Sequence, residues 1–232
     1  MSQSFNLPEV YMAGAFALIL PPLYTAATTA LVVLLAFRLG SDRQGADIAA
    51  LSYAFCTISS AYAREFYPEP LIAVLVILSV YLIFGTSARS QLIGSFTAGL
   101  ALLAKPSTIL LGPLLSVYLF FKKQPLAIAI APSISTSVFA GIYGVYNYVR
   151  FGSPVSFGQS WMTNAATEIL AAPVSAKDGN HLTEGLLGMI VSPGRGVIWY
   201  SPCVLLGFVG FFYAYKSKRY ESLLIIGFSV IF

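Results

Sequence analysis

Charged residues are scarce in this sequence. Lysine and arginine together number 13 among 232 residues, and aspartate and glutamate number 9, so that charged residues make up 9%. A water-soluble domain carries roughly 25%, so the scarcity excludes an ordinary soluble globular protein. The net charge of +4 is spread between long apolar runs. Because the basic residues are spread out in this way, the chain lacks the concentrated basic surface that binding of nucleic acid requires.

Cysteine and histidine are equally rare. The two cysteines, Cys56 and Cys203, fall inside apolar runs, and their spacing indicates neither a disulfide framework nor a metal site. The single histidine, His181, lies in a polar interval, where it is either a solvated loop residue or a catalytic one. There is no Asn-X-Ser/Thr acceptor, phosphate-binding loop, zinc-protease helix, dinucleotide fingerprint or Gly-X-Ser-X-Gly elbow. These absences exclude the common signatures of soluble enzymes.

Apolar runs of membrane length are what the sequence does contain. Hydrophobic residues make up 57% of the chain, and its mean hydropathy is +0.79. We predict an all-α, polytopic membrane protein, a single membrane domain over residues 1–232 with about seven transmembrane helices. The proline pair Pro21-Pro22 is expected to begin or kink the first span. The predicted spans are 22–37, 48–63, 70–84, two short helices within 91–121, 125–148 and 197–215.

Charge decides how the run from Gln91 to Phe121 folds. If it is a hairpin broken at Lys105-Pro106, one membrane face holds eight basic and three acidic residues, and the other face holds five basic and six acidic residues. A single long helix would scramble this asymmetry. Because basic residues gather on the cytoplasmic side of membrane proteins, we predict the hairpin. The polar link 64–69, Lys105 and the long loop 151–194 are then exoplasmic, with one short helix expected at 161–170.

Three separated segments bring charge to that exoplasmic face. Glu69 stands between two prolines at the start of a predicted helix, where it either caps the helix or binds an acceptor or a metal ion. Lys105 is either an interfacial anchor or a contact to an anionic lipid head group. Arg195 lies in Ser-Pro-Gly-Arg-Gly directly before a predicted helix. That pattern is typical of a turn, and it also suits a phosphate site, because glycines expose backbone N–H groups and arginine can bridge two phosphate oxygens.

Four segments in order resemble bacterial membrane glycosyltransferases with the GT-C fold, of the glycosyltransferase family 39 and protein mannosyltransferase-like group. The first is Tyr-Ala-Arg-Glu-Phe-Tyr-Pro-Glu-Pro-Leu (62–71), and the second is Gly-Leu-Ala-Leu-Leu-Ala-Lys-Pro-Ser (99–107). The others are Tyr-Asn-Tyr-Val-Arg-Phe-Gly-Ser-Pro (146–154) and Ser-Pro-Gly-Arg-Gly-Val-Ile-Trp-Tyr-Ser-Pro (192–202). The likeness covers roughly residues 20–215.

The resemblance implies transfer of a sugar from a polyprenyl-phosphate donor to a lipid, glycan or protein acceptor at the exoplasmic face of a bacterial inner membrane, as part of cell-envelope synthesis. It implies no cofactor with certainty, although a divalent metal ion is compatible with it. The implied catalytic candidates are Glu69 and Glu65. The implied contacts to the donor phosphate are Arg195, Lys105 and Arg64. The implied acceptor and loop contacts are Tyr148, Arg150, Tyr200 and His181.

The sequence departs from this family in one respect. The family places a catalytic aspartate in a first exoplasmic loop, whereas no aspartate precedes Asp178 on the predicted exoplasmic face here. We therefore expect the chain to be a fragment that lacks that loop and has no transferase activity by itself. A transporter or lipid flippase and a non-catalytic membrane scaffold are the alternatives. Transport is disfavoured because the charges cluster at the ends of the spans and not at their centres.

Overall fold

A computed structural model of the chain describes residues 7–155 and, in the C-terminal part, residues 187–188, 190–193, 196–201, 203, 207 and 210. These residues form helices and turns and contain no strand, which confirms the prediction of an all-α fold. The helices are α1 (Leu7–Arg38), α2 (Arg43–Phe55), α3 (Ser59–Tyr62), α4 (Glu69–Ile83), α5 (Ala88–Ala104), the 3-10 helix η1 (Pro106–Leu110), α6 (Leu111–Phe121), α7 (Leu126–Ala129), α8 (Ala131–Phe151) and α11 (Val197–Tyr200).

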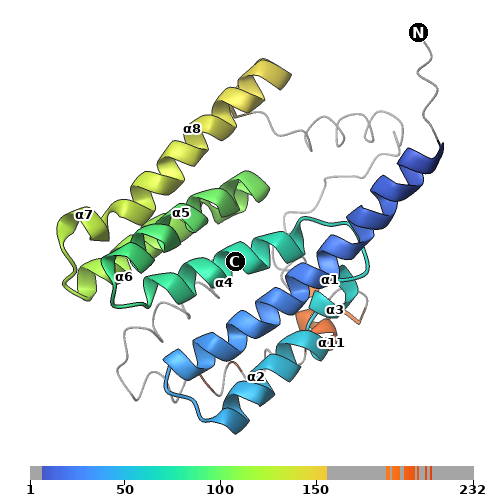
Figure 1. Cartoon of the computed structure of the whole chain (residues 1–232), viewed down its shortest axis with the longest axis horizontal. Helices are drawn as coiled ribbons and strands as arrows, with labels where there is room; N and C mark the ends of the chain where they lie inside the picture. Colours follow the sequence, from blue (N-terminus) through green and yellow to red (C-terminus); the bar gives the residue numbers. More distant parts are fainter. Residues whose placement is uncertain are drawn as a thin grey trace.

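The long helices form an up-and-down bundle (Figure 1). Helix α1 packs against α2 and α4, α4 packs against α5, and α8 covers α5 and α6. The apolar core lies where α4, α5 and α6 meet, and it is built around Val80, Ile83, Leu111, Leu115 and Leu119. Short connections between consecutive helices enforce the antiparallel order.

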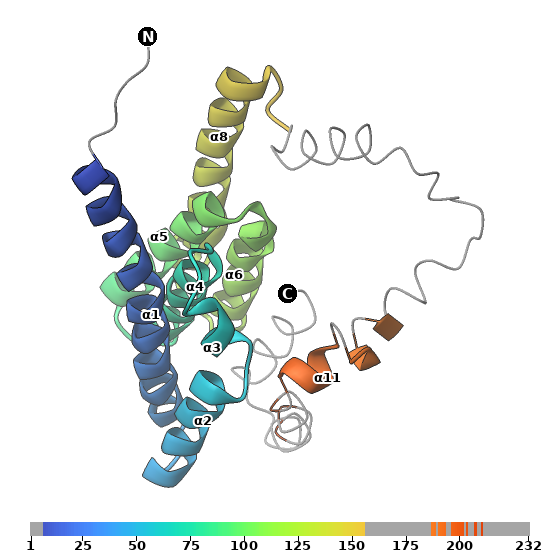
Figure 2. The ribbon, with the colours of Figure 1, turned by 90° about the vertical axis from the view of Figure 1, so that its right-hand side faces the viewer.

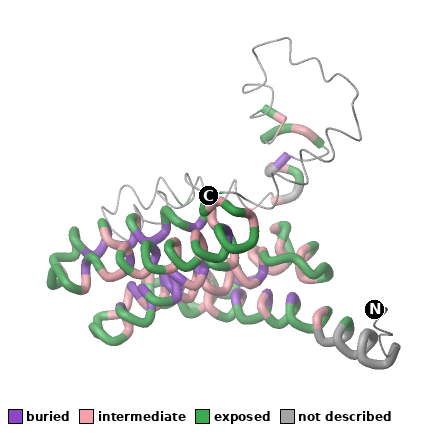
Figure 3. Tube along the Cα trace, turned by 90° about the horizontal axis from the view of Figure 1, so that it is seen from above, coloured by how far each residue is buried: buried purple, intermediate pink, exposed green. Residues whose placement is uncertain are grey.

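Helix α5 buries mostly small residues and exposes several large apolar ones. Gly94, Ser95 and Ala98 are buried, whereas Leu92 and Phe96 are 50% and 53% exposed. Figure 3 shows buried positions between the helices of the bundle and exposed positions around them. A helix of a water-soluble bundle turns its large apolar side chains inward, so exposed Leu92 and Phe96 differ from that pattern.

Small residues allow the helices to approach closely. The Ser79 hydroxyl donates to the Gly94 carbonyl oxygen over 2.7 Å and so joins α4 to α5. A Cβ added at Gly99 would lie 2.2 Å from the Phe139 ring, and one added at Gly112 would lie 2.6 Å from the Pro132 carbonyl oxygen. The contact of α6 with α8 therefore requires glycine, and the contact of α5 with α8 is close at Gly99, as in many helix pairs in membranes.

One described helix segment is long and apolar enough to cross a membrane. It spans Ala17–Arg38 within α1, whereas Glu69–Ile83 and Pro106–Phe121 are apolar but shorter. Length and composition thus support one such helix near the N-terminus. The prediction of about seven is not confirmed among the described residues.

The first helix does not begin at Pro21-Pro22 as one alternative predicted, because α1 continues through both prolines. A proline ring fixes φ near the helical value, so the pair removes two backbone hydrogen bonds without forcing the helix to end. The Thr25 hydroxyl donates to the Pro21 carbonyl oxygen over 3.0 Å just after the pair. The helix therefore starts well before the predicted position at residue 22.

The predicted span 48–63 is also wrong in its bounds. Helix α2 begins at Arg43, because the Asp42 carboxylate accepts a hydrogen bond from the Gly45 N–H over 2.8 Å and caps the first turn. The helix ends at Phe55, and α3 follows only at Ser59. Hydroxyl groups of Thr57 and Ser59 both donate to the Tyr53 carbonyl oxygen. Such local hydrogen bonds compete with the helical ones.

The other predicted spans agree more closely. Helix α4 matches 70–84 to within one residue at each end, and the hairpin over 91–121 is confirmed, with α5 and α6 separated at Lys105. The span 125–148 is divided into α7 and α8, and α8 extends to Phe151. The predicted helix 161–170 and most of the span 197–215 lie outside the described residues. Residues 187–188 and 190–191, within the predicted loop, are helical.

The charged residues lie at the two ends of this bundle. One end holds the α1–α2, α4–α5 and α6–α7 turns, where the Arg38 guanidinium donates to the Tyr81 carbonyl oxygen and lies 3.9 Å from the centre of the Tyr81 ring. The other end, which we call the link end, holds α3, residues 63–68, the start of α4 and the end of α5 (Figures 1 and 2). For the described residues, the charged side chains therefore share an end as predicted, whereas the predicted positions of Arg195 and of the charges at 168–184 and 216–221 lie outside the described residues.

Candidate functional site

The link end is shaped by aromatic and proline residues. Residues 63–68 turn from α3 into α4, and the Tyr67 N–H donates to the Glu65 carbonyl oxygen over 2.9 Å within that turn. The rings of Tyr62 and Tyr67 meet edge to face with their centres 5.6 Å apart. Pro70 lies in the first turn of α4, where its missing N–H has no helical partner to lose. These contacts fix the position of Glu69 at the start of α4.

Glu69 and Lys105 form an ion pair across the link end. The Lys105 Nζ lies 3.2 Å from the Glu69 Oε1. Lys105 is held between α5 and η1 in an extended conformation, with φ −155° and ψ 120°, because the residue before a proline disfavours the helical region. The pair therefore joins the beginning of α4 to the end of α5, which lie side by side in the bundle.

Only one oxygen of the Glu69 carboxylate has a partner in the described part of the chain. Oε2 is buried and makes no hydrogen bond there, although the Glu69 side chain as a whole is 32% exposed. An unpaired buried carboxylate oxygen is unfavourable unless a further group donates to it. The arrangement leaves an acceptor atom beside an ammonium group whose other N–H bonds are available to a ligand.

This geometry differs from two simple interpretations of the sequence, in which Glu69 caps α4 and Lys105 is an interfacial anchor. The N-cap of α4 is Pro68, which makes no side-chain capping bond, and Glu69 uses its Oε1 for Lys105. Lys105 lies against a carboxylate and is 48% exposed. An ion pair this exposed stabilises a fold by about 0.2–1 kcal/mol. Fold stability alone therefore gives little reason for the pair.

The other predicted site residues that the structure describes form no ion pair or hydrogen bond with Glu69 or Lys105. Arg64 and Glu65 are exposed, and their side chains form no ion pair or hydrogen bond with the described residues. Tyr148 is 63% exposed on α8. Arg150 stays on the same helix, donating to the Tyr146 hydroxyl and lying 5.5 Å from the centre of the Phe151 ring. Arg195, His181 and the side chain of Tyr200 lie outside the described residues.

Asn147 is not among the predicted site residues, although it is 1% exposed. Its Nδ2 donates to the Pro154 carbonyl oxygen over 3.4 Å, and Gly152, with φ 74°, ends α8 in between. The bond folds the chain after α8 back onto the helix. A lone asparagine in an aromatic run was the available signal, because a polar side chain in such a run needs a partner.

Comparison with known proteins gives no relative. No protein-family model, curated protein or solved structure matches this chain. The resemblance to GT-C glycosyltransferases therefore stays a hypothesis that rests on the four sequence segments.

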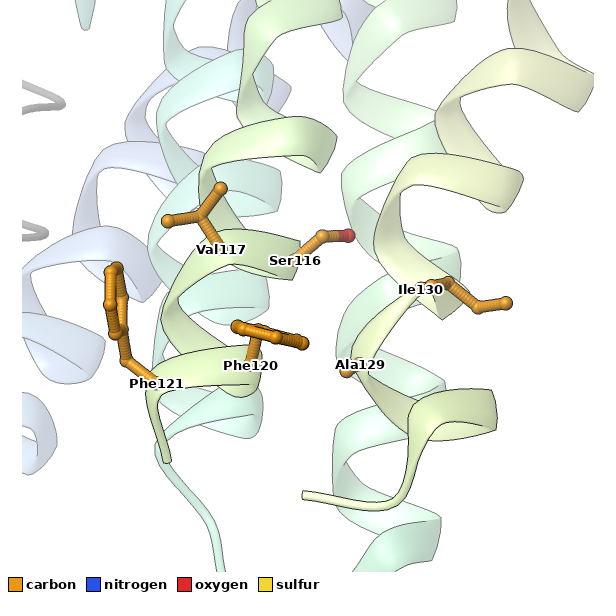
Figure 4. Close-up of a pocket in the computed structure, with 6 residues that line it drawn as sticks. All are labelled: Ser116, Val117, Phe120, Phe121, Ala129 and Ile130. Carbon is orange, nitrogen blue, oxygen red and sulfur yellow. The ribbon is translucent and has the colours of Figure 1, made fainter. Parts of the chain in front are cut away.

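A separate apolar groove lies at the opposite end of the bundle. It has a volume of about 390 Å³ and is lined by Ser116, Val117, Phe120 and Phe121 of α6 and by Ala129 and Ile130 across from them (Figure 4). None of the predicted site residues lines it. The described residues also contain no group of three or more His, Cys, Asp or Glu side chains that could hold a metal ion. Among the described parts, the Glu69–Lys105 pair is the arrangement best suited to chemistry on a polar ligand.

Proposed function

We propose that this chain is part of a glycosyltransferase that moves a sugar from a polyprenyl-phosphate donor to an acceptor hydroxyl at the outer face of a bacterial inner membrane. The observation that carries the proposal is the Glu69–Lys105 pair, which places a free carboxylate oxygen next to a cation. Both residues also lie in segments that resemble the GT-C family. Transfer of this kind needs a proton acceptor and a cation for the departing phosphate.

Embedding in the membrane as a multi-pass bundle is part of this proposal. The outward-facing Leu92 and Phe96 of α5 and the apolar helix over Ala17–Arg38 support it. So does the apolar surface of the bundle between its two charged ends, because Val138 and Val145 of α8 are both more than half exposed. Contact with lipid tails removes the unfavourable exposure of such side chains to water.

The proposed chemistry assigns a task to each member of the pair. The acceptor hydroxyl donates its hydrogen bond to Glu69 Oε2, and the carboxylate takes the proton as the acceptor oxygen bonds to the sugar's anomeric carbon. The bond from that carbon to the lipid phosphate breaks, and the polyprenyl phosphate leaves with the electron pair. Lys105 keeps one N–H on Glu69 Oε1 and directs others to the phosphate.

A transfer assay tests the proposal. Membranes from cells that express the chain within its natural reading frame are supplied with radiolabelled polyprenyl-phosphate sugars, and label is followed into non-donor products. We expect transfer that depends on the presence of the chain. If label stays on the donor while the protein is present in the membrane at normal level, the proposal is wrong.

Orientation in the membrane gives a second prediction. Among the described residues, the end opposite the link end carries five basic residues (Arg38, Arg43, Arg89, Lys122 and Lys123) and two acidic ones (Asp42 and Asp47), and it should face the cytoplasm. In a chain with Cys56 and Cys203 changed to serine, we expect Phe66→Cys to react with a membrane-impermeant maleimide in intact cells. Thr86→Cys, in the α4–α5 turn, should react only after permeabilisation. The reverse pattern would overturn the orientation.

A further inference from the structure

The two cysteines of the chain are far apart in the sequence and meet in the fold. Cys56 ends α2, where its N–H donates to the Ser52 carbonyl oxygen. Cys203 follows α11, and its thiol lies near that of Cys56. Both are free thiols in the structure. No other cysteine exists in the sequence, so each thiol has one possible partner within the chain.

A neighbouring hydrogen bond joins the two segments that carry the cysteines. The Ile58 N–H donates to the Ser201 hydroxyl oxygen over 3.3 Å, two residues from each cysteine. Figures 1 and 2 both show α11 beside the corner of α2 and α3. Cys56 is exposed and Cys203 is half-buried, so a reagent in solution reaches one thiol while the other lies beside it.

We propose that Cys56 and Cys203 are a redox-active pair that closes into an intramolecular disulfide, tying the segment around α11 to the α2–α3 corner. This inference does not depend on sugar transfer. The α2–α3 corner leads into residues 63–68. The disulfide would therefore hold α11 next to the link end, which carries Glu69. In the orientation proposed above, these thiols face an oxidising compartment, in which disulfides persist.

The step is an ordinary thiol–disulfide exchange, with an oxidised disulfide such as glutathione disulfide as the oxidant. The thiolate of Cys56 attacks one sulfur of the oxidant, and one glutathione leaves as a thiolate. The thiolate of Cys203 then attacks the Cys56 sulfur of the mixed disulfide and expels the second glutathione. The two protein thiols lose two electrons and two protons, and the oxidant becomes two glutathione thiols.

Cleavage at methionine makes the bond visible whatever the chain's conformation. Cyanogen bromide cuts after Met12, Met162 and Met189, so that Cys56 lies in fragment 13–162 and Cys203 in fragment 190–232. The purified chain is reduced, freed of reductant, treated with glutathione disulfide, trapped with acid and cleaved. We expect the two fragments to stay joined until dithiothreitol is added, and the intact chain to lose two hydrogen atoms in mass.

Single-serine variants supply the matched controls. In Cys203→Ser, Cys56 should remain as a stable glutathione adduct, because no second thiol is present to expel the glutathione. Cys56→Ser should never yield joined fragments. Three results for the wild-type chain would overturn the proposal. These are separate fragments after oxidation, a glutathione adduct that persists, and a disulfide-linked dimer on a non-reducing gel before cleavage.

Discussion

Gly112→Leu is expected to separate α6 from α8 and to abolish the folded bundle. A Cβ at this position would lie 2.1 Å from the Thr136 Oγ1 and 2.6 Å from the Pro132 carbonyl oxygen. The backbone oxygen cannot rotate away, and Thr136 is 2% exposed and donates to that same oxygen. Overpacking commonly lowers the free energy of unfolding by about 1–3 kcal/mol, and a side chain forced against backbone lies at or beyond the upper end.

Size-exclusion chromatography and thermal denaturation in detergent measure this effect. Gly112→Leu should give aggregated protein or none, and Gly112→Ala a folded protein with a lower melting temperature. Gly141→Ala is the control, because nothing lies within 4 Å of a Cβ at Gly141 on the neighbouring helix α8. That variant should be as stable as the wild type or more stable, by up to about 1 kcal/mol from helix propensity. A Gly112→Leu protein as stable as the control would refute the close packing of α6 on α8.

Glu69→Gln and Lys105→Met are each expected to lower the rate of sugar transfer by about 10²–10³-fold, the loss typical of one preorganised charged or polar group at a reacting centre. Glutamine keeps the shape of Glu69 but cannot take a proton. Methionine keeps the length of Lys105 and removes its charge. Membrane levels of both variants should stay normal, since a pair this exposed stabilises the fold by about 0.2–1 kcal/mol.

The double variant separates joint action from independent action. If Glu69 and Lys105 work as a unit, the double variant should be about as slow as either single variant, because groups that act together give non-additive losses. Glu65→Gln is the matched control, since Glu65 lies in the same link but is exposed and forms no side-chain ion pair or hydrogen bond with the described residues. A loss confined to Glu65→Gln would transfer the catalytic role to that acid and remove it from the ion pair.

Over residues 7–155, the sequence predicted which segments are helices and which charges share an end of the bundle. It did so because apolar runs, prolines and the asymmetry of basic residues are local or additive properties. The hairpin at Lys105-Pro106 followed from charge alone, and the extended backbone of Lys105 confirms its place. Helix bounds were less predictable where side chains decide them, as at Asp42, whose carboxylate starts α2 earlier than hydropathy indicates.

Tertiary structure alone decided which side chains meet. The Glu69–Lys105 ion pair and the contact between Cys56 and Cys203 join residues from different helices. Their distances depend on how α4 lies on α5 and where α11 lies against the α2–α3 corner. From the sequence, Glu69 and Lys105 were given separate tasks, and both cysteines were placed in apolar packing. The reason is that neither the spacing of residues nor the composition tells how two helices cross. A Cβ added at Gly94 would lie 3.0 Å from the Ser79 carbonyl oxygen, so close contact there sets how α5 lies on α4, and steric fit between helices is a property of the assembled bundle.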